Sequence, residues 1–172
     1  VCFLHAYANY SHELRVRELI REANPNIFVS LSGEVLPEIK EYERVSTTVI
    51  NAYLMPRMKR YLERFSQEVR NLGIPDQPFI MNSGGGVVSP ALASQRPIDT
   101  LFSGPSGGVS GVGYLASLLD LPNIVTFDMG GTSTDVCLIK DHRPEVTQSR
   151  MIDGLPVKST ALDVHTVGAG GS

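Results

Sequence analysis

Two aspartates flank a turn of glycines and hydroxyl residues in the second half of the chain. Residues 124–139 read IVTFDMGGTSTDVCLI, so one apolar run ends at Asp128 and another begins after Asp135. This pattern predicts a strand, a tight loop and a returning strand. Gly130 and Gly131 have no Cβ, so the loop backbone can bring its N–H groups within hydrogen-bonding distance of an anion. Phosphate is the ligand that this loop suits best.

The acids and hydroxyls extend the chemistry that this loop can perform. Asp128 and Asp135 can hold Mg²⁺, through its waters because Mg²⁺ dehydrates reluctantly. The hydroxyls that can bond to phosphate oxygens or to metal-bound water belong to Thr132, Ser133 and Thr134. Taken alone, the motif also fits an Asp/Gly hairpin without a ligand. Two acids around a Gly-Gly-Thr-Ser-Thr turn favour a nucleotide.

A second Gly-rich segment, residues 103–116, reads SGPSGGVSGVGYLA. A strand over Ile98–Phe102, a glycine turn and a helix could present a helix N-terminus to phosphate, which makes Gly104 a candidate cofactor contact. The glycines continue into the helix, and we expect that small-residue face to pack closely against another helix. The three glycines at residues 84–86 favour a simple turn.

Asp163 and His165 stand two residues apart near the end of the chain. In a strand both side chains would point the same way, so we expect them to line the substrate site. The alternative is a hydrogen-bonded structural pair. The other three histidines have no matching acids or cysteines at ligand spacing, and we assign them no metal.

The elements that must position these residues follow from periodicity. Val1–Tyr7 and Ile27–Leu31 read as strands around a helix that Asn9 or Ser11 caps and that ends at about Ala23. This order favours a parallel or mixed α/β sheet. A long helix is expected from Glu38 to Leu72, kinked or interrupted at Pro56. Its basic cluster (Arg57, Lys59, Arg60) reads as a solvated face.

Shorter elements complete the predicted order. Ser89 caps a short helix that begins at Pro90. Strands are expected at residues 79–81, at 98–102 and, as an edge strand, at 145–152. Residues 140–144 form a polar hairpin turn between the returning strand and that edge strand.

Composition excludes some partners. The 172 residues are 42% hydrophobic and 19% charged with a formal net charge of −3, so nothing predicts binding to nucleic acid or to an anionic membrane. No apolar run approaches the ~18 residues of a membrane span. Cys2 and Cys137 lie in apolar runs and are expected to be reduced, which fits the cytoplasm.

The order of several motifs resembles that of the hydantoinase/oxoprolinase family, and within it the A-type subunits. The phosphate motif Phe127–Asp135 is joined to Ser103–Val109 upstream and Asp163–Ser172 downstream. Further stretches that look like the family are His5–Asn9, Glu41–Arg44 and Thr47–Leu54.

The resemblance implies an α/β fold similar to actin, hexokinase and sugar kinases (ribonuclease H-like), with a mixed sheet and flanking helices. It implies ATP and Mg²⁺, with Gly168 and Gly170 among the nucleotide contacts and Asp128 and Asp135 as catalytic residues. The implied reaction is ATP-dependent hydrolysis of a cyclic amide such as hydantoin, N-methylhydantoin or 5-oxoproline, through phosphorylation of its carbonyl oxygen. A hydantoinase B-type subunit or domain is the implied partner, and oligomeric state stays open.

The family carries a first Asp-x-Gly-Gly-Thr hairpin near its N-terminus, and Asp128–Asp135 would be the second; no such motif stands upstream of it in this chain. We therefore expect a fragment, inactive alone, in which residues 1–76 form a segment with the long helix and residues 77–172 a glycine-rich phosphate-binding segment. Two alternatives remain: a non-catalytic module for subunit assembly, and a small-molecule kinase of the same superfamily.

Overall fold

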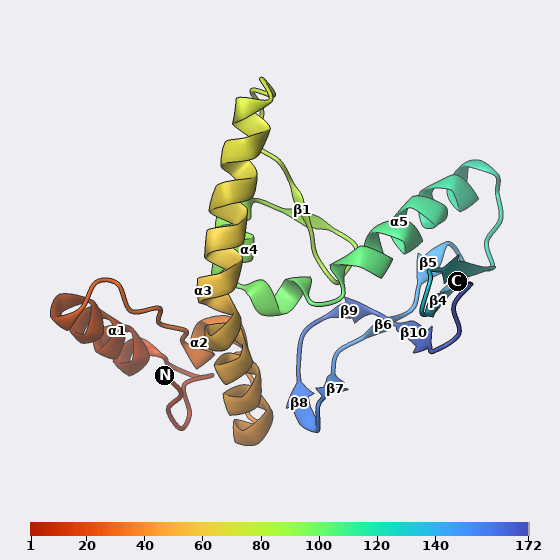
Figure 1. The fold of residues 1–172 in the computed structure, drawn as a ribbon. Helices are drawn as coiled ribbons and strands as arrows, with labels where there is room; N and C mark the ends of the chain where they lie inside the picture. Colours follow the sequence, from red (N-terminus) through yellow and green to blue (C-terminus); the bar gives the residue numbers. More distant parts are fainter. Residues whose placement is uncertain (172) are drawn as a thin grey trace. The chain divides into compact units, whose positions relative to one another are not determined.

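The computed structural model describes residues 1–171, drawn in Figure 1. The chain forms two compact units that interleave in sequence. Unit 1 contains residues 1–78, 89–98 and 149–159, and unit 2 contains residues 79–88, 99–148 and 160–171. Neither unit is a continuous stretch of the chain.

Unit 1 is built on the long helix α3 (Glu41–Asn71). Its other elements are α1 (Ser11–Ala23), α2 (Ser32–Val35), α4 (Pro90–Gln95) and the hairpin of β7 (Arg150–Ile152) with β8 (Leu155–Val157). The core joins Val35, Leu36, Ile98 and Val157. The long helix is thus confirmed, and it continues through Pro56 without interruption.

The N-terminal half of α3 buries polar side chains. Thr47 is fully buried; its hydroxyl donates to Glu43 O at 2.7 Å and accepts from Lys158 N at 3.0 Å. Asn51 Nδ2 donates to Ser30 Oγ and to Gln95 O, and its Oδ1 accepts from Ile98 N. Because these hydroxyl and amide groups have hydrogen-bond partners, their burial costs little free energy, and the bonds join segments that are distant in sequence.

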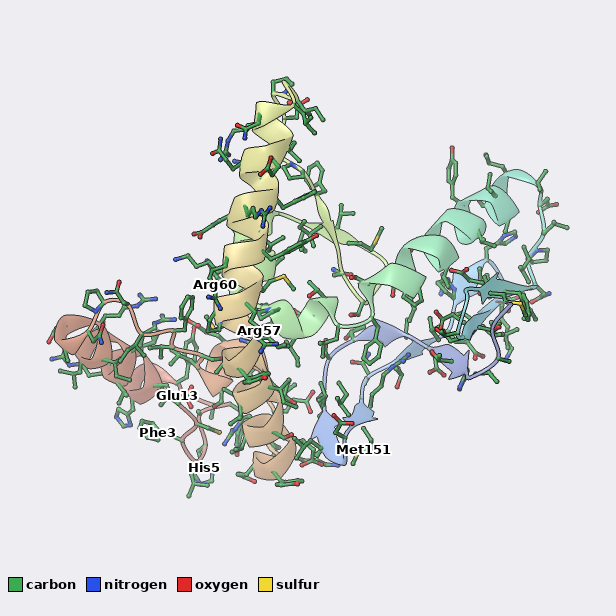
Figure 2. All side chains as sticks on the ribbon, viewed as in Figure 1. Phe3, His5, Glu13, Arg57, Arg60 and Met151 are labelled. Carbon is green, nitrogen blue, oxygen red and sulfur yellow. The ribbon has the colours of Figure 1, made fainter. Side chains whose placement is uncertain are left out.

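A buried carboxylate and a buried guanidinium hold the N-terminal segment. Glu13 on α1 is fully buried and accepts from Phe3 N (2.8 Å), Ser32 Oγ (2.6 Å) and Gly33 N (2.9 Å). Arg44 donates from Nη2 to Phe3 O at 2.8 Å. Figure 2 shows Phe3 and Glu13 together beside α1. The two charged groups therefore satisfy both backbone polar groups of Phe3.

Unit 2 is a small antiparallel sheet packed against one helix. Its elements are β1 (Ile80–Met81), β2 (Val87–Val88), α5 (Ser103–Leu118), β3 (Ile124–Met129), β4 (Thr134–Lys140), β5 (Arg143–Pro144), β6 (Val146–Thr147), β9 (Ala161–Leu162) and β10 (Val164–Val167). The main sheet has the order β10-β4-β3, with β5 also on β4. The core joins Val109 of α5 to Cys137, Ile139, Leu162 and Val164.

The turn between β1 and β2 holds the start of α5. Ser83 O accepts from the Ser106 hydroxyl and from Leu162 N, while its own hydroxyl accepts from Phe102 N. Gly85 has a φ of +84°, and Ser110 on α5 donates to its carbonyl at 3.0 Å. The small residues of α5 therefore pack against this turn, where we expected another helix.

The α/β class is confirmed, and several elements are as predicted. Ser89 Oγ accepts from Leu92 N at the start of α4, and the turn between β4 and β5 has positive φ at Asp141 and His142. Both cysteines are free, with Cys137 buried in β4. None of the helices in the part described has both the length and the apolar composition of a membrane span.

Three predicted strands were wrong, and a fourth was predicted as one strand where the structure has two. Residues 1–7 and 27–31 contain no strand, Pro97–Thr100 is a 3₁₀ helix (η1), and residues 145–152 divide into β6 and β7. Every strand pair among the described residues is antiparallel, in place of a parallel or mixed sheet. For residues 1–7 and 98–102 the physical reason is that buried side chains bind the backbone: Glu13 and Arg44 at Phe3, Asn51 at Ile98, and Ser83 at Phe102.

Candidate functional site: two opposed carboxylates beside a glycine loop

The β3–β4 hairpin places Asp128 directly opposite Asp135. Directly opposite residues of an antiparallel pair share a face of the sheet, with Cβ atoms roughly 5 Å apart. Both aspartates line a cavity of about 230 Å³ whose other wall is α5, through Pro105, Gly108 and Val109. The hairpin predicted from the sequence thus brings its two acids together at one cavity.

Like charges in this arrangement repel. At roughly 5 Å the repulsion is about 1 kcal/mol between solvated charges and grows as water is excluded. A cation between the carboxylates would remove that cost. Mg²⁺ needs only one or two carboxylates when phosphate and water complete its shell. Within residues 1–171 no group of three or more His, Cys, Asp or Glu side chains could hold a metal, so a cation at this pair would need further ligands from phosphate or water.

Thr166 on β10 completes this face of the sheet. It pairs with Asp135 in the register of β10 on β4, and its hydroxyl donates to Asp135 Oδ1 at 2.6 Å. This bond fixes one oxygen of the carboxylate and leaves the other oxygen available to a ligand. The sequence reasoning missed Thr166, since only the strand register shows that it faces the cavity side.

The loop from Gly130 to Ser133 offers backbone donors. Gly130 N donates to Ser133 O at 2.8 Å and closes the turn. The amides of Gly131, Thr132 and Ser133 make no hydrogen bond within the part of the chain described, and Gly131 has no atom within 4 Å of the place a Cβ would take. Consecutive free amides in a glycine turn are typical of an anion-binding nest.

A second glycine loop, residues 168–171, is hydrogen-bonded to the first. The Thr134 hydroxyl, buried, donates to Ala169 O at 2.6 Å, and Gly171 N donates to Gly130 O at 3.0 Å. A Cβ on Gly170 would lie 2.1 Å from Gly131 O, whereas Gly168 has open space around it. The structure therefore brings Gly168 and Gly170 to the hairpin. Ser172, the last residue of this motif, lies outside the described residues.

Gly104 lies in the first turn of α5. Nothing approaches within 4 Å of the place its Cβ would take, and the cavity wall begins at the next residue, Pro105. The N-cap residue Phe102 makes no side-chain hydrogen bond that caps the helix. Gly104 is thus near the cavity without lining it, and its contact with a cofactor stays a prediction.

Asp163 and His165 lie on the other face of the sheet from the two acids. His165 pairs with Val136, the neighbour of Asp135 on β4, and successive strand residues point to opposite faces. His165 Nε2 is 3.5 Å from Asp163 Oδ2, and the His165 side chain is 75% exposed. The structure joins these two residues to each other and not to the cavity, and their role in lining a substrate stays a prediction.

The residues present fit a magnesium-bound phosphate group. Two opposed carboxylates, three free amides and the Thr132 and Ser133 hydroxyls supply the donor set that such a group requires. The Thr134 hydroxyl already donates to Ala169 O. Within the described residues, Thr134 therefore acts first by holding the two loops together.

Comparison with known proteins identifies the family. Residues 44–172, most of the chain, match the model of the hydantoinase/oxoprolinase family. The chain belongs to the hydantoinase/oxoprolinase family. The resemblance expected from the motifs is thereby confirmed, and the matched region of this family member contains the whole β3–β4 hairpin and both glycine loops.

Relatives within the hydantoinase/oxoprolinase family include three enzymes. The chain is 39% identical to 5-oxoprolinase of Saccharomyces cerevisiae over all of its own length and 13% of that protein. It is 35% identical to caprolactamase subunit alpha of Pseudomonas jessenii over 99% of the chain and 25% of the relative. The crystal structure of that ATP-dependent caprolactamase superposes with a TM-score of 0.85 at 34% identity, over 96% of this chain and 24% of that one.

The third relative is acetone carboxylase. Its nucleotide-free structure, from work on ATP-dependent acetone carboxylation, superposes with a TM-score of 0.78 at 30% identity over 97% of this chain and 24% of that one. The chain thus spans about a quarter of the length of caprolactamase subunit alpha and of the acetone carboxylase chain.

Proposed function

We propose that the protein is an ATP-dependent enzyme that activates the carbonyl group of a cyclic amide, and that unit 2 supplies one magnesium and phosphate site. The observation that carries the proposal is the opposed pair Asp128 and Asp135 at the mouth of a glycine loop. Two relatives are named for cyclic amides, 5-oxoproline and caprolactam, and one is described as ATP-dependent.

The chain's own residues would act by position and charge. Asp128 and Asp135 would hold Mg²⁺ through its waters, and Thr166 would keep the Asp135 carboxylate oriented. The free amides of Gly131, Thr132 and Ser133 would donate to phosphate oxygens, where fixed donors cost no reorganisation as charge develops.

Bound ATP would supply a phosphoryl group to the amide carbonyl oxygen with release of ADP, which makes the carbonyl carbon open to attack by water. The ring C–N bond would then break with the nitrogen leaving as an amine, and a second water would release phosphate and leave a carboxylate. The proposed substrates are hydantoin, N-methylhydantoin or 5-oxoproline. Because one relative is a subunit alpha, we propose a hydantoinase B-type partner that completes hydrolysis. Two free cysteines suit the reducing cytoplasm, where we place the protein.

The test compares Asp128→Asn and Asp135→Asn with a matched control in the purified native protein. Asp141→Asn changes an aspartate at the far end of β4, in a turn that Asn tolerates at its φ of 49°. The rate of substrate-dependent ADP release should fall by about 100-fold or more in Asp128→Asn and in Asp135→Asn, which is the usual effect of removing one group that stabilises charge in the transition state. The rate should stay unchanged in Asp141→Asn. Wild-type rates in Asp128→Asn would refute the assignment.

The likeness to acetone carboxylase favours a second candidate, ATP-dependent carboxylation of a ketone. The two reactions give different products from the same phosphate site. Detection of a ring-opened product would identify an amidohydrolase, and incorporation of bicarbonate carbon into a ketone would identify a carboxylase. A stable phosphorylated product would instead identify a small-molecule kinase, and no nucleotide binding at all would identify an assembly module.

A further inference from the structure

A cavity in unit 1 concentrates arginine side chains. It has a volume of about 490 Å³ and lies among α1, α2, α3 and the C-terminal end of α4. Three guanidinium groups line it, from Arg17, Arg21 and Arg96, against the single carboxylate of Glu34. The chain as a whole carries a formal charge of −3, so this positive excess is local.

Two of these arginines keep N–H groups without a partner. Arg17 Nη1 donates to both oxygens of Glu34 at 2.8 Å, while its Nη2 and Nε make no hydrogen bond within the described residues. Arg21, one helical turn further along α1, makes no hydrogen bond or ion pair there. The Arg17 side chain is only 21% exposed. A guanidinium partly withdrawn from water gains most from an anionic acceptor.

Arg96 forms a fixed part of the opposite wall. Its Nη1 donates to Glu34 O, and its Nη2 donates to Val35 O at 3.2 Å. These two carbonyls end α2, where a positive side chain is favoured by the helix dipole. The positive charge of Arg96 is therefore held at the cavity by the fold itself.

The remaining wall carries both polar and apolar groups. Val29 and Met55 are half-buried there, Leu31 and Val35 are buried, and the polar groups of Asn51 are already bonded to Ser30, Gln95 and Ile98. A ligand in this cavity would meet charged donors at one side and hydrocarbon at the other. Its volume falls in the range of about 300–1,000 Å³ that is usual for small-molecule sites.

We propose that this cavity binds a small organic anion: a carboxylate or phosphate head group on Arg17 and Arg21, and a short apolar body against Val29 and Met55. The shared chemistry is an oxyanion, for which the planar guanidinium fork is well suited. This site is separate from the hairpin residues on which the proposed function depends.

Titration calorimetry on the native protein tests the proposal, with acetate, butyrate, hexanoate and inorganic phosphate as probes. Arg21→Gln removes a guanidinium that makes no hydrogen bond or ion pair in the described chain, and Arg15→Gln is the control on the same helix, 60% exposed and paired with Glu18. Arg21→Gln should weaken hexanoate binding by about tenfold or more, while Arg15→Gln leaves it unchanged. Affinity should rise up to about fourfold for each added methylene that is buried.

Three results would overturn the proposal. One is that no probe binds with a Kd of about 1 mM or tighter. Another is equal weakening by Arg15→Gln and Arg21→Gln, which would indicate general attraction to the helix. The third is that, with Mg²⁺ present, phosphate is the one probe that binds and its binding is weakened by Asp128→Asn and not by Arg21→Gln, which would place the anion at the hairpin.

Discussion

Gly170 lies against the peptide that joins Gly131 to Thr132, so closely that a Cβ on Gly170 would come 2.1 Å from Gly131 O and 2.5 Å from Thr132 N. Both neighbours are backbone atoms, which cannot swing aside as a flexible side chain can. Gly170 is therefore needed for the second glycine loop to rest on the first, and it helps to set the direction of the free amides.

Gly170→Ala should displace the hairpin loop. We expect the affinity for Mg-ATP in the native protein to fall by about tenfold or more, since the amides of Gly131 and Thr132 would lose their alignment. Gly111→Ala on α5 is the control, because nothing lies within 4 Å of the added methyl and alanine favours a helix interior. Calorimetry measures both, and equal affinities in the two variants would contradict the loop contact.

Thr134→Val should loosen the two loops without changing the shape of the side chain. The lost donor leaves Ala169 O without the 2.6 Å bond, and we expect the free energy of unfolding to fall by about 1–2 kcal/mol. Thr134→Ser keeps the hydroxyl and should lose less. Urea unfolding compares the variants, and an equal free energy of unfolding for Thr134→Val and Thr134→Ser would rule out this role of the hydroxyl.

Removal of magnesium should weaken nucleotide binding through the two carboxylates. With EDTA, wild-type affinity for ATP should fall by about tenfold or more, because Asp128 and Asp135 would then face the phosphates with no cation between them. Asp128→Asn should respond less, since one of the repelling charges is gone. An EDTA effect of the same size in the variant would place the metal elsewhere.

Glu13→Gln should destabilise unit 1. One carboxylate oxygen of Glu13 accepts from Phe3 N and Ser32 Oγ, and the other accepts from Gly33 N. In Gln an NH₂ group replaces one of these oxygens and cannot accept, so at least one buried donor loses its partner. We expect a loss of about 2–3 kcal/mol. Glu18→Gln on the same helix is the control: Glu18 is 61% exposed in its pair with Arg15 and should stay within about 0.5 kcal/mol. Denaturant unfolding gives both values.

The hairpin and the long helix could be predicted because local signals determine them. Two apolar runs around Gly130 and Gly131 specify β3, a turn and β4, and the register of Asp128 on Asp135 follows from the loop length. The 31 residues of α3 and the Ser89 cap likewise follow from periodicity and capping.

Two of the wrong strands, at residues 1–7 and 98–102, share one cause. Phe3, Ile98 and Phe102 lie in apolar runs, but their backbone groups bond to the side chains of Glu13, Arg44, Asn51 and Ser83, which are distant in sequence. A buried polar side chain can replace a neighbouring strand as a hydrogen-bond partner. No local pattern in residues 1–7 or 98–102 reveals such a partner.

The choice between the two faces of β10 required the strand register as well. Asp163 and His165 attracted attention by residue type, yet Thr166 is the residue that pairs with Asp135. A period of two shows which residues share a face but not which face meets the cavity. That information lies in the pairing of β10 with β4.

The interleaving of the two units sets the order in which they can be completed during synthesis. Val157, 3% exposed, belongs to the core of unit 1, and it is made after nearly all of unit 2. In unit 2, strand β6 cannot pair until β9 has been synthesised, since Val146 pairs with Leu162 and Thr147 with Ala161. Synthesis must therefore reach Leu162 before both units can be completed, so folding of the earlier residues alone cannot complete either unit.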